Sequence, residues 1–310
     1  MSDGSVRARL FLASALSRDF GEGRGFSGAL AQAHLTNLAG LGPRVPESEE
    51  DAAARGYLAR EFQLAGVTLE TLDFEPSRHL VDEIPGASGD AVLLVAPYSA
   101  LGSDRWIDDS GAVLLLELTR VLSGQSRPCT VRVALADRRP GPEAGADEAL
   151  ADGPQPPENA LARRRAARAG ASLASALEAS GGLTDLRVVI AFELRAGAEP
   201  RIARGLRSHP VFSAVFWAAE AALDHSASFP RDAGWRSSPG LQGAFRERGL
   251  GQVLALVDET IARAELQAGF GALPQGRRAC AVGLEPVGSV TLGGLKRQMR
   301  RFERADAFPR

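Results

Sequence analysis

The stretch from Ala91 to Leu122 constrains what this chain can fold into more than any other stretch. Ala91 to Ala96 is a short apolar run, which is typical of a strand covered on both faces. Pro97 ends the run, because proline cannot donate a hydrogen bond to a sheet ladder. The residues from Asp108 to Ser110 favour a helix start, and Gly111 to Leu122 is apolar enough for a buried helix. Open α/β sheets place their binding sites at the carboxyl ends of such strands.

Strand and helix patterns alternate along about 280 residues. We expect helices over residues 26–41, 48–65, 111–122, 160–179, 210–223, 241–248 and 287–302, and strands over 67–74, 91–96, 130–136, 186–194 and 252–257. This alternation predicts one α/β domain over residues 26–310, with a central, mixed, mostly parallel sheet flanked by helices on both faces. Residues 1–25 are expected to be a poorly ordered N-terminal segment, and the Pro- and Ala-rich residues 138–159 a flexible insertion.

Composition argues against several classes of partner. The net charge is −2, so there is no electrostatic case for binding nucleic acid or an anionic membrane. No apolar run approaches the ~20 residues that a membrane span needs. The apolar run from Leu10 to Leu16 is short for a signal peptide, so we expect a cytoplasmic protein. Cys129 and Cys280 are expected to be two separate thiols.

The strand–loop–helix stretch resembles the core of the zinc-dependent M28 aminopeptidases and the related glutaminyl cyclases. In that family the strand ends in A-H-x-D, and a G-A-x-D-x-A-S-G turn opens the following helix. Ala96–Ser99 and Trp106–Gly111 stand in those two places here. Residues 38–46 also resemble the family's opening L-x-x-L-G-P-R-x-P-G-S segment, and residues 79–86 its v-N-v-i-a-x-x-x-G strand and turn. The resemblance implies a fold like that of the zinc exopeptidases.

The family binds one or two zinc ions through His and carboxylate ligands, and a glutamate acts as general acid and base. The resemblance places Pro97 at the ligand histidine of A-H-x-D and Ser99 at its aspartate. Proline has no donor atom for a metal. The bridging aspartate falls on Asp108 if one gap is allowed and on Ile107 without the gap. We favour helix capping as the role of Asp108 and Asp109.

The strand end that carries the catalytic glutamate in the family, D-G-E-E, falls on residues 137–140. Arg138 and Arg139 stand there, and a guanidinium repels zinc and cannot abstract a proton at neutral pH. Recruitment of Glu143 or Glu148 from the nearby loop is left open.

Glu193 retains an acidic ligand position at the end of the apolar run LRVVIAFEL. A carboxylate that ends a buried strand is seldom left unpaired. We therefore predict that Glu193 forms an ion pair with Arg138 or Arg139 in place of a metal.

The last zinc histidine of the family falls on Gln242, and glutamine is a poor zinc ligand. The later H-T-x-x-D element falls around residues 269–275, where neither the histidine nor the aspartate exists. His225 lies in a loop before Gln242. We favour a surface-loop histidine there over one that enters a pocket.

At least three metal positions are lost together, so the favoured hypothesis is a catalytically inactive relative that needs no cofactor and binds an unknown protein or peptide partner. The alternative is a zinc aminopeptidase or glutaminyl-peptide cyclotransferase with a rebuilt site, using Asp108, Glu193 and a loop carboxylate or His225. A metal-free enzyme built on Arg138, Arg139 and Glu193 ranks last, because nothing there supplies an activated nucleophile.

Overall fold

The computed structural model describes residues 25–42, 44, 47–98, 105–137, 158–194, 200–205, 208–230, 235–236, 240–258 and 284–303. We expected residues 1–25 to be poorly ordered and residues 138–159 to form a flexible insertion. Both segments lie almost wholly outside the described residues. Within the described part, no helix combines the length and the apolar character that a membrane crossing requires. Cys129 is a buried free thiol, while Cys280 lies outside the described residues.

The described residues form an eight-stranded mixed sheet in the order β1-β2-β4-β3-β5-β8-β6-β7. The strands are β1 (Glu70–Phe74), β2 (Ser77–Ile84), β3 (Ser88–Pro97), β4 (Cys129–Ala136), β5 (Leu186–Glu193), β6 (Ile202–Gly205), β7 (Trp235–Arg236) and β8 (Val253–Asp258). The central strands β4, β3, β5 and β8 run parallel, and β2 and β6 flank them in the antiparallel sense. The predicted fold class is confirmed, and all four parallel strands end at one edge.

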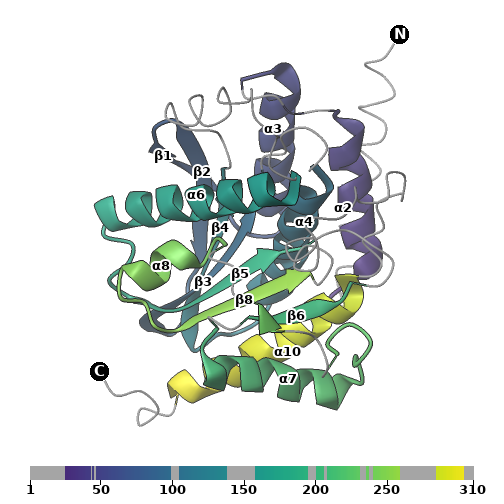
Figure 1. Ribbon diagram of the computed structural model, residues 1–310, viewed down its shortest axis with the longest axis vertical. Coiled ribbons are helices and arrows are strands. Elements are labelled where there is room, and N and C mark those ends of the chain that lie inside the picture. Colours follow the sequence, from purple (N-terminus) through teal and green to yellow (C-terminus); the bar gives the residue numbers. More distant parts are fainter. Residues whose placement is uncertain are drawn as a thin grey trace.

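Helices cover both faces of the sheet (Figure 1). One face carries α2 (Gly28–Gly40), α3 (Glu49–Leu64), α4 (Arg105–Ser123), α7 (Pro210–Leu223) and α10 (Leu284–Glu303), and the other α6 (Glu158–Ala179) and α8 (Gly243–Glu247). Alternate residues of β3 divide between the two cores: Val92 and Leu94 belong to the α4 side, Leu93 and Val95 to the α6 side. A strand buried on both faces reads as a continuous apolar run, which explains why it was visible in the sequence.

Most expected helices and strands appear, with local differences. Ser48 caps α3 by accepting a hydrogen bond from the Asp51 N–H at 3.2 Å, and Gly66 follows the helix with a φ of +93°. The apolar pattern of residues 48–65 predicts that Leu64 faces the core together with Leu58 and Phe62, but the exposed fraction of Leu64 is 46%. It lies two residues after the buried Phe62, about 200° further round the helix. The short strands β6 and β7 were not predicted, because they offer too few residues for a periodic pattern.

The first and last described helices meet at the N-terminus of α2. Glu117 of α4 accepts a hydrogen bond from the Ser27 N–H at 2.8 Å, and Glu285 of α10 accepts one from the Gly28 N–H. These carboxylates satisfy N–H groups that a helix start leaves without intrahelical partners. The ring of Phe26 lies where a side chain at Gly288 of α10 would otherwise stand. The start of α2 is therefore fixed by residues far along the chain.

Candidate functional site

Acidic side chains gather at the edge where the parallel strands end. Asp137 follows β4, Glu193 ends β5 and Asp258 ends β8, and their exposed fractions are 0%, 2% and 3%. Pro97 ends the neighbouring strand β3, in register with Ala136. Buried carboxylates are stable only when hydrogen bonds or opposite charges compensate them. The partners of these side chains therefore decide what the edge can do.

The carboxylate of Glu193 binds the main chain of a turn that precedes α8. Its Oε1 accepts a hydrogen bond from the Leu241 N–H at 2.9 Å. Gly240 has a φ of +31°, and a Cβ there would collide with Glu193 Oε1 and lie 2.6 Å from Gln242 Oε1. Glu193 and Gln242, two positions carried over from the family's ligand set, are therefore neighbours across one glycine.

Asp137 belongs to a second network, shared with the start of β2. Its Oδ2 accepts a hydrogen bond from the Arg78 N–H at 2.9 Å, and its own N–H donates to His79 Nδ1 at 3.1 Å. The Tyr98 hydroxyl donates to the Arg78 carbonyl at 2.6 Å. Because β2 runs antiparallel to β4, its first residues lie beside the last residues of β4. The network ties the ends of β3 and β4 to the start of β2.

His79 is held in its neutral form. Since Nδ1 accepts the Asp137 N–H, the ring proton is on Nε2, which donates to the Ser172 hydroxyl of α6 at 3.0 Å. Burial lowers the pKa of His79 to about 4. A histidine that donates to a serine cannot take the proton of that serine, so this pair is not arranged for nucleophilic catalysis.

A buried ion pair stands near the start of α4. Arg44 pairs with Asp109, and both side chains are buried. The helix begins at Arg105, so the prediction that Asp108 and Asp109 cap it was wrong. Asp109 instead lies within the helix and meets a cation from the loop before α3. Gly111 lets this part of α4 lie directly on the sheet, because a Cβ there would be 2.8 Å from the Ala96 Cβ.

The structure brings together some of the positions carried over from the family. Pro97, Glu193 and Gln242 belong to the carboxyl edge, while Asp108 lies in α4 and its side chain is not described. Ser99, Arg138, Arg139, Glu143 and Glu148 lie outside the described residues, so the predicted Glu193–arginine ion pair stays a prediction. His225 is half-buried in the turn after α7, where its carbonyl accepts hydrogen bonds from Ser228 and Phe229.

Three residues of this edge were missed by sequence reasoning. Arg44 lay inside the segment that resembles the family's opening L-x-x-L-G-P-R, which marked it as part of the fold but not as the partner of an acid. His79 opens the second family-like segment, and Gly240 stands beside Gln242. A lone arginine, histidine or glycine carries no periodic signal, so only the folded chain identifies its partner.

The described residues do not fit a zinc ion. Zinc takes Cys, His or carboxylate ligands in a tetrahedral set. Within the described ranges, no three His, Cys, Asp or Glu side chains are arranged to hold a metal. Asp109 meets a guanidinium, Glu193 takes a main-chain N–H, and His79 accepts one.

No protein-family model matches the sequence, and no curated protein matches it significantly. Solved structures do match. A glutaminyl cyclase from an Acidobacteriales bacterium is 15% identical, covering 89% of this chain and 96% of its own with a TM-score of 0.66. A leucine aminopeptidase precursor from Bacteroides thetaiotaomicron is 14% identical, with coverages of 87% and 97% and a TM-score of 0.66. A Zn-dependent exopeptidase from Parabacteroides distasonis is 15% identical, with coverages of 87% and 98% and a TM-score of 0.63.

Proposed function

We propose that this chain, which has the fold of the glutaminyl cyclases and Zn-dependent exopeptidases, is a catalytically inactive protein of that fold that binds a peptide or protein partner without zinc. One observation carries the proposal. The polar groups at the carboxyl edge are engaged by protein groups: Glu193 by the Leu241 N–H and Asp109 by Arg44. An acid that holds a buried guanidinium or amide is not poised for proton transfer or metal binding.

The class of ligand follows from the neighbours of the fold. They include glutaminyl cyclases and a leucine aminopeptidase, so we propose a peptide, or a protein that offers a peptide segment. Open α/β sheets bind ligands outside the carboxyl ends of their strands, which is where the networks of Glu193 and Asp137 lie. Fold alone does not fix an activity, so the proposal depends on the side chains and their partners.

Metal analysis and turnover assays test the proposal together. Protein purified without chelators is expected to contain far less than one zinc per chain and to show no turnover on amino-terminal glutaminyl and aminoacyl peptides. The same preparation is expected to bind to some members of an immobilised peptide library. Stoichiometric zinc accompanied by turnover would refute the proposal, and so would the absence of any bound peptide or protein.

A second candidate is a zinc aminopeptidase or glutaminyl-peptide cyclotransferase with a rebuilt site. It is favoured by the three buried acids, Asp137, Glu193 and Asp258, which stand at the ends of three of the four parallel strands, β4, β5 and β8. It predicts turnover that is lost in a Glu193→Gln variant whose melting temperature is unchanged. Under the first proposal there is no turnover to lose.

A further inference from the structure

The turn formed by residues 240–242, called here the Gly240 turn, approaches Glu193 unusually closely. The Leu241 N–H donates to Glu193 Oε1 at 2.9 Å, and the Glu193 side chain is almost fully buried. A hydrogen bond from an N–H to a carboxylate is charge-assisted and stronger than one between neutral groups. The carboxylate that resemblance assigns to a metal is thus bound by backbone.

Gly240 permits this approach. Its φ of +31° lies in the region that residues with a side chain rarely adopt, and its Cβ would collide with Glu193 Oε1. The same Cβ would lie 2.9 Å from the Glu193 Cδ and 2.6 Å from Gln242 Oε1. The space between Gly240 and the Glu193 carboxylate is therefore too small for one additional methyl group.

A second glycine, on a different element, closes the turn from the other side. A Cβ at Gly170 of α6 would collide with the Leu241 carbonyl oxygen and lie 2.9 Å from the Leu241 Cα. Leu241 itself is fully buried in the core between α6, α8 and the sheet. The Gly240 turn is thus held between the end of β5 and α6.

We infer that the Gly240 turn is a main-chain plug that engages Glu193 at the place where a metal would sit, so that Glu193 is an anchor for the turn and not a ligand. The inference rests on the proposed function in one respect, because both require that Glu193 binds no metal. The inference adds what occupies Glu193 instead of a metal. The Leu241 N–H supplies the positive pole that the carboxylate binds, and Gly170 and Gly240 make room for the turn that carries this N–H.

Thermal unfolding of four variants tests the plug. Glu193→Gln keeps an oxygen that accepts the Leu241 N–H, so its melting temperature should stay within about 3 °C of the wild type. Glu193→Ala removes the acceptor and should lower the melting temperature by about 4–10 °C. Gly240→Ala should cause a loss as large. Gly249→Ala is the matched control, because Gly249 also has a positive φ, +86°, but no atom within 4 Å of its Cβ.

The coupling between the two positions is the decisive measurement. Removing the Glu193 carboxylate removes the closest obstacle to a Cβ at residue 240, so the Glu193→Ala/Gly240→Ala variant should melt no lower than the less stable of the two single variants. Additive losses would overturn the plug, as would a Glu193→Gln loss equal to that of Glu193→Ala. If Glu193→Ala does not fold, equal losses in Gly240→Ala and Gly249→Ala overturn it. Zinc that binds the wild type and Glu193→Gln equally tightly would refute the proposed function and leave the plug standing, because Glu193 would not be its ligand.

Discussion

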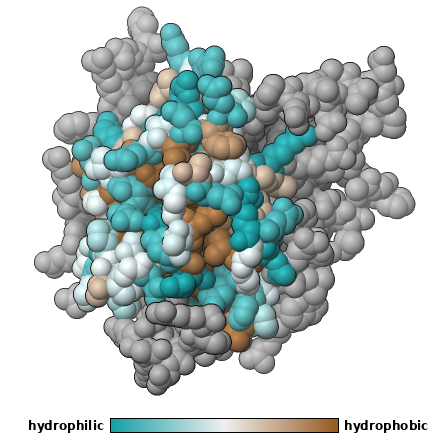
Figure 2. Space-filling model, turned by 90° about the vertical axis from the view of Figure 1, so that its left-hand side faces the viewer, coloured by the Kyte–Doolittle hydropathy of each residue, from teal (hydrophilic) through white to brown (hydrophobic). Residues whose placement is uncertain are grey.

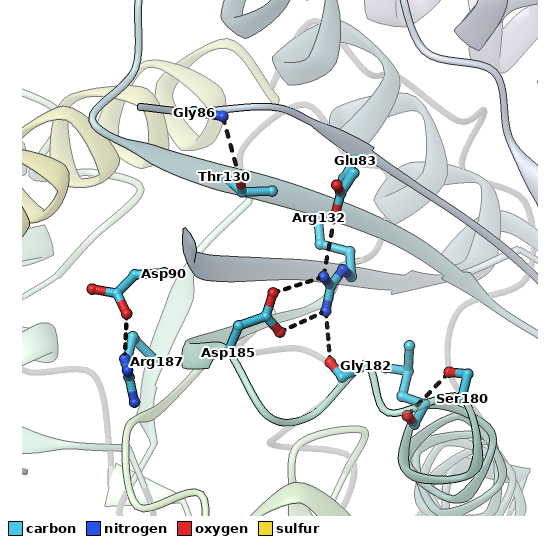
Figure 3. Close-up of polar contacts among 10 residues, drawn as sticks. Glu83, Gly86, Asp90, Thr130, Arg132, Ser180, Gly182, Asp185 and Arg187 are labelled. Carbon is cyan, nitrogen blue, oxygen red and sulfur yellow. Dashed lines mark hydrogen bonds and ion pairs between the residues drawn. The ribbon is translucent and has the colours of Figure 1, made fainter. Parts of the chain in front are cut away.

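Charged side chains have opposite roles at the two ends of the parallel strands. The amino edge is the rim of the sheet where these strands begin, and the carboxyl edge is the rim where they end. At the amino edge, Arg132 binds Glu83 and Asp185 at 3.1 Å each and donates to the Gly182 carbonyl at 2.6 Å (Figure 3). Glu83 and Asp185 are 46% and 39% exposed. At the carboxyl edge, Glu193 and Asp137 are buried and bind main-chain N–H groups. Water can replace a lost partner at the first edge but not at the second.

This difference separates charges whose lost partners water can replace from charges whose lost partners leave a buried polar group unsatisfied. Figure 2 shows the face on the left of Figure 1, where hydrophilic residues surround a central strip of hydrophobic ones. Exposed ion pairs contribute about 0–1 kcal/mol each, whereas breaking a buried pair costs about 3–5 kcal/mol. Substitutions at the two edges should therefore differ several-fold in how much they lower the free energy of unfolding.

The largest effect is expected at the buried pair Arg44–Asp109. Arg44→Met should lower the free energy of unfolding by about 3–5 kcal/mol, because it leaves the Asp109 carboxylate buried without its cation. Urea unfolding measures the loss. The Arg44→Met/Asp109→Leu variant should recover much of it, since neither charge then remains buried. A single variant as stable as the wild type would show that the pair is not buried in solution.

Acid should weaken the fold through two histidines. Burial lowers the pKa of His79 to about 4, and burial together with the charge of Arg120 does the same for His34. The unfolded chain takes up these protons near pH 6.5 and the folded chain only near pH 4. Stability is therefore lost as pH falls through that window, by about 3 kcal/mol for each histidine. Urea unfolding at pH 7, 5.5 and 4.5 measures the slope.

His79→Asn sharpens the acid test. Asparagine offers an oxygen to the Asp137 N–H but cannot take up a proton, so the variant should lose about half of the acid dependence. An unchanged slope would place the titration elsewhere.

Gly111→Ala should lower the free energy of unfolding by about 1–3 kcal/mol, because the new Cβ would lie 2.8 Å from the Ala96 Cβ and 3.4 Å from the Phe192 carbonyl oxygen. Gly56→Ala in α3 is the matched control. Its Cβ meets nothing within 4 Å, so alanine should stabilise that helix by about 0.5–1 kcal/mol. The two substitutions should shift the urea midpoint in opposite directions. A shift in the same direction would mean that α4 does not lie so close to β3.

The smallest effect is expected at the amino edge. Arg187 and Asp90 form an ion pair of 2.7 Å with exposed fractions of 46% and 37%. Arg187→Ala should change the free energy of unfolding by less than about 1 kcal/mol, and the change should shrink further in high salt. A loss as large as that of Arg44→Met would remove the contrast between the edges.

Local patterns predicted most of the fold, and contacts between distant residues account for what they missed. The apolar runs of β3 and β5 and the helix predicted over residues 48–65, which Ser48 caps and Gly66 follows, depend on neighbours within a few residues, and each was visible in the sequence. The partners of Asp109, Asp137 and Glu193 lie 65, 58 and 48 residues away. Each contact joins single residues, which leave no repeat to detect. The family resemblance placed Glu193 at a ligand position, but the partners that we predicted for it, Arg138 or Arg139, lie outside the described residues.

The meeting of α2 with α4 and α10 sets a condition on how the protein is made. Phe26 and the first amides of α2 leave the ribosome about 260 residues before Glu285 and Gly288 do. The nascent chain must therefore carry the start of α2 without its partners until α10 has been made. A messenger truncated before residue 284 would yield a product with an exposed aromatic ring and a helix start without its acid, a substrate for chaperones and proteases.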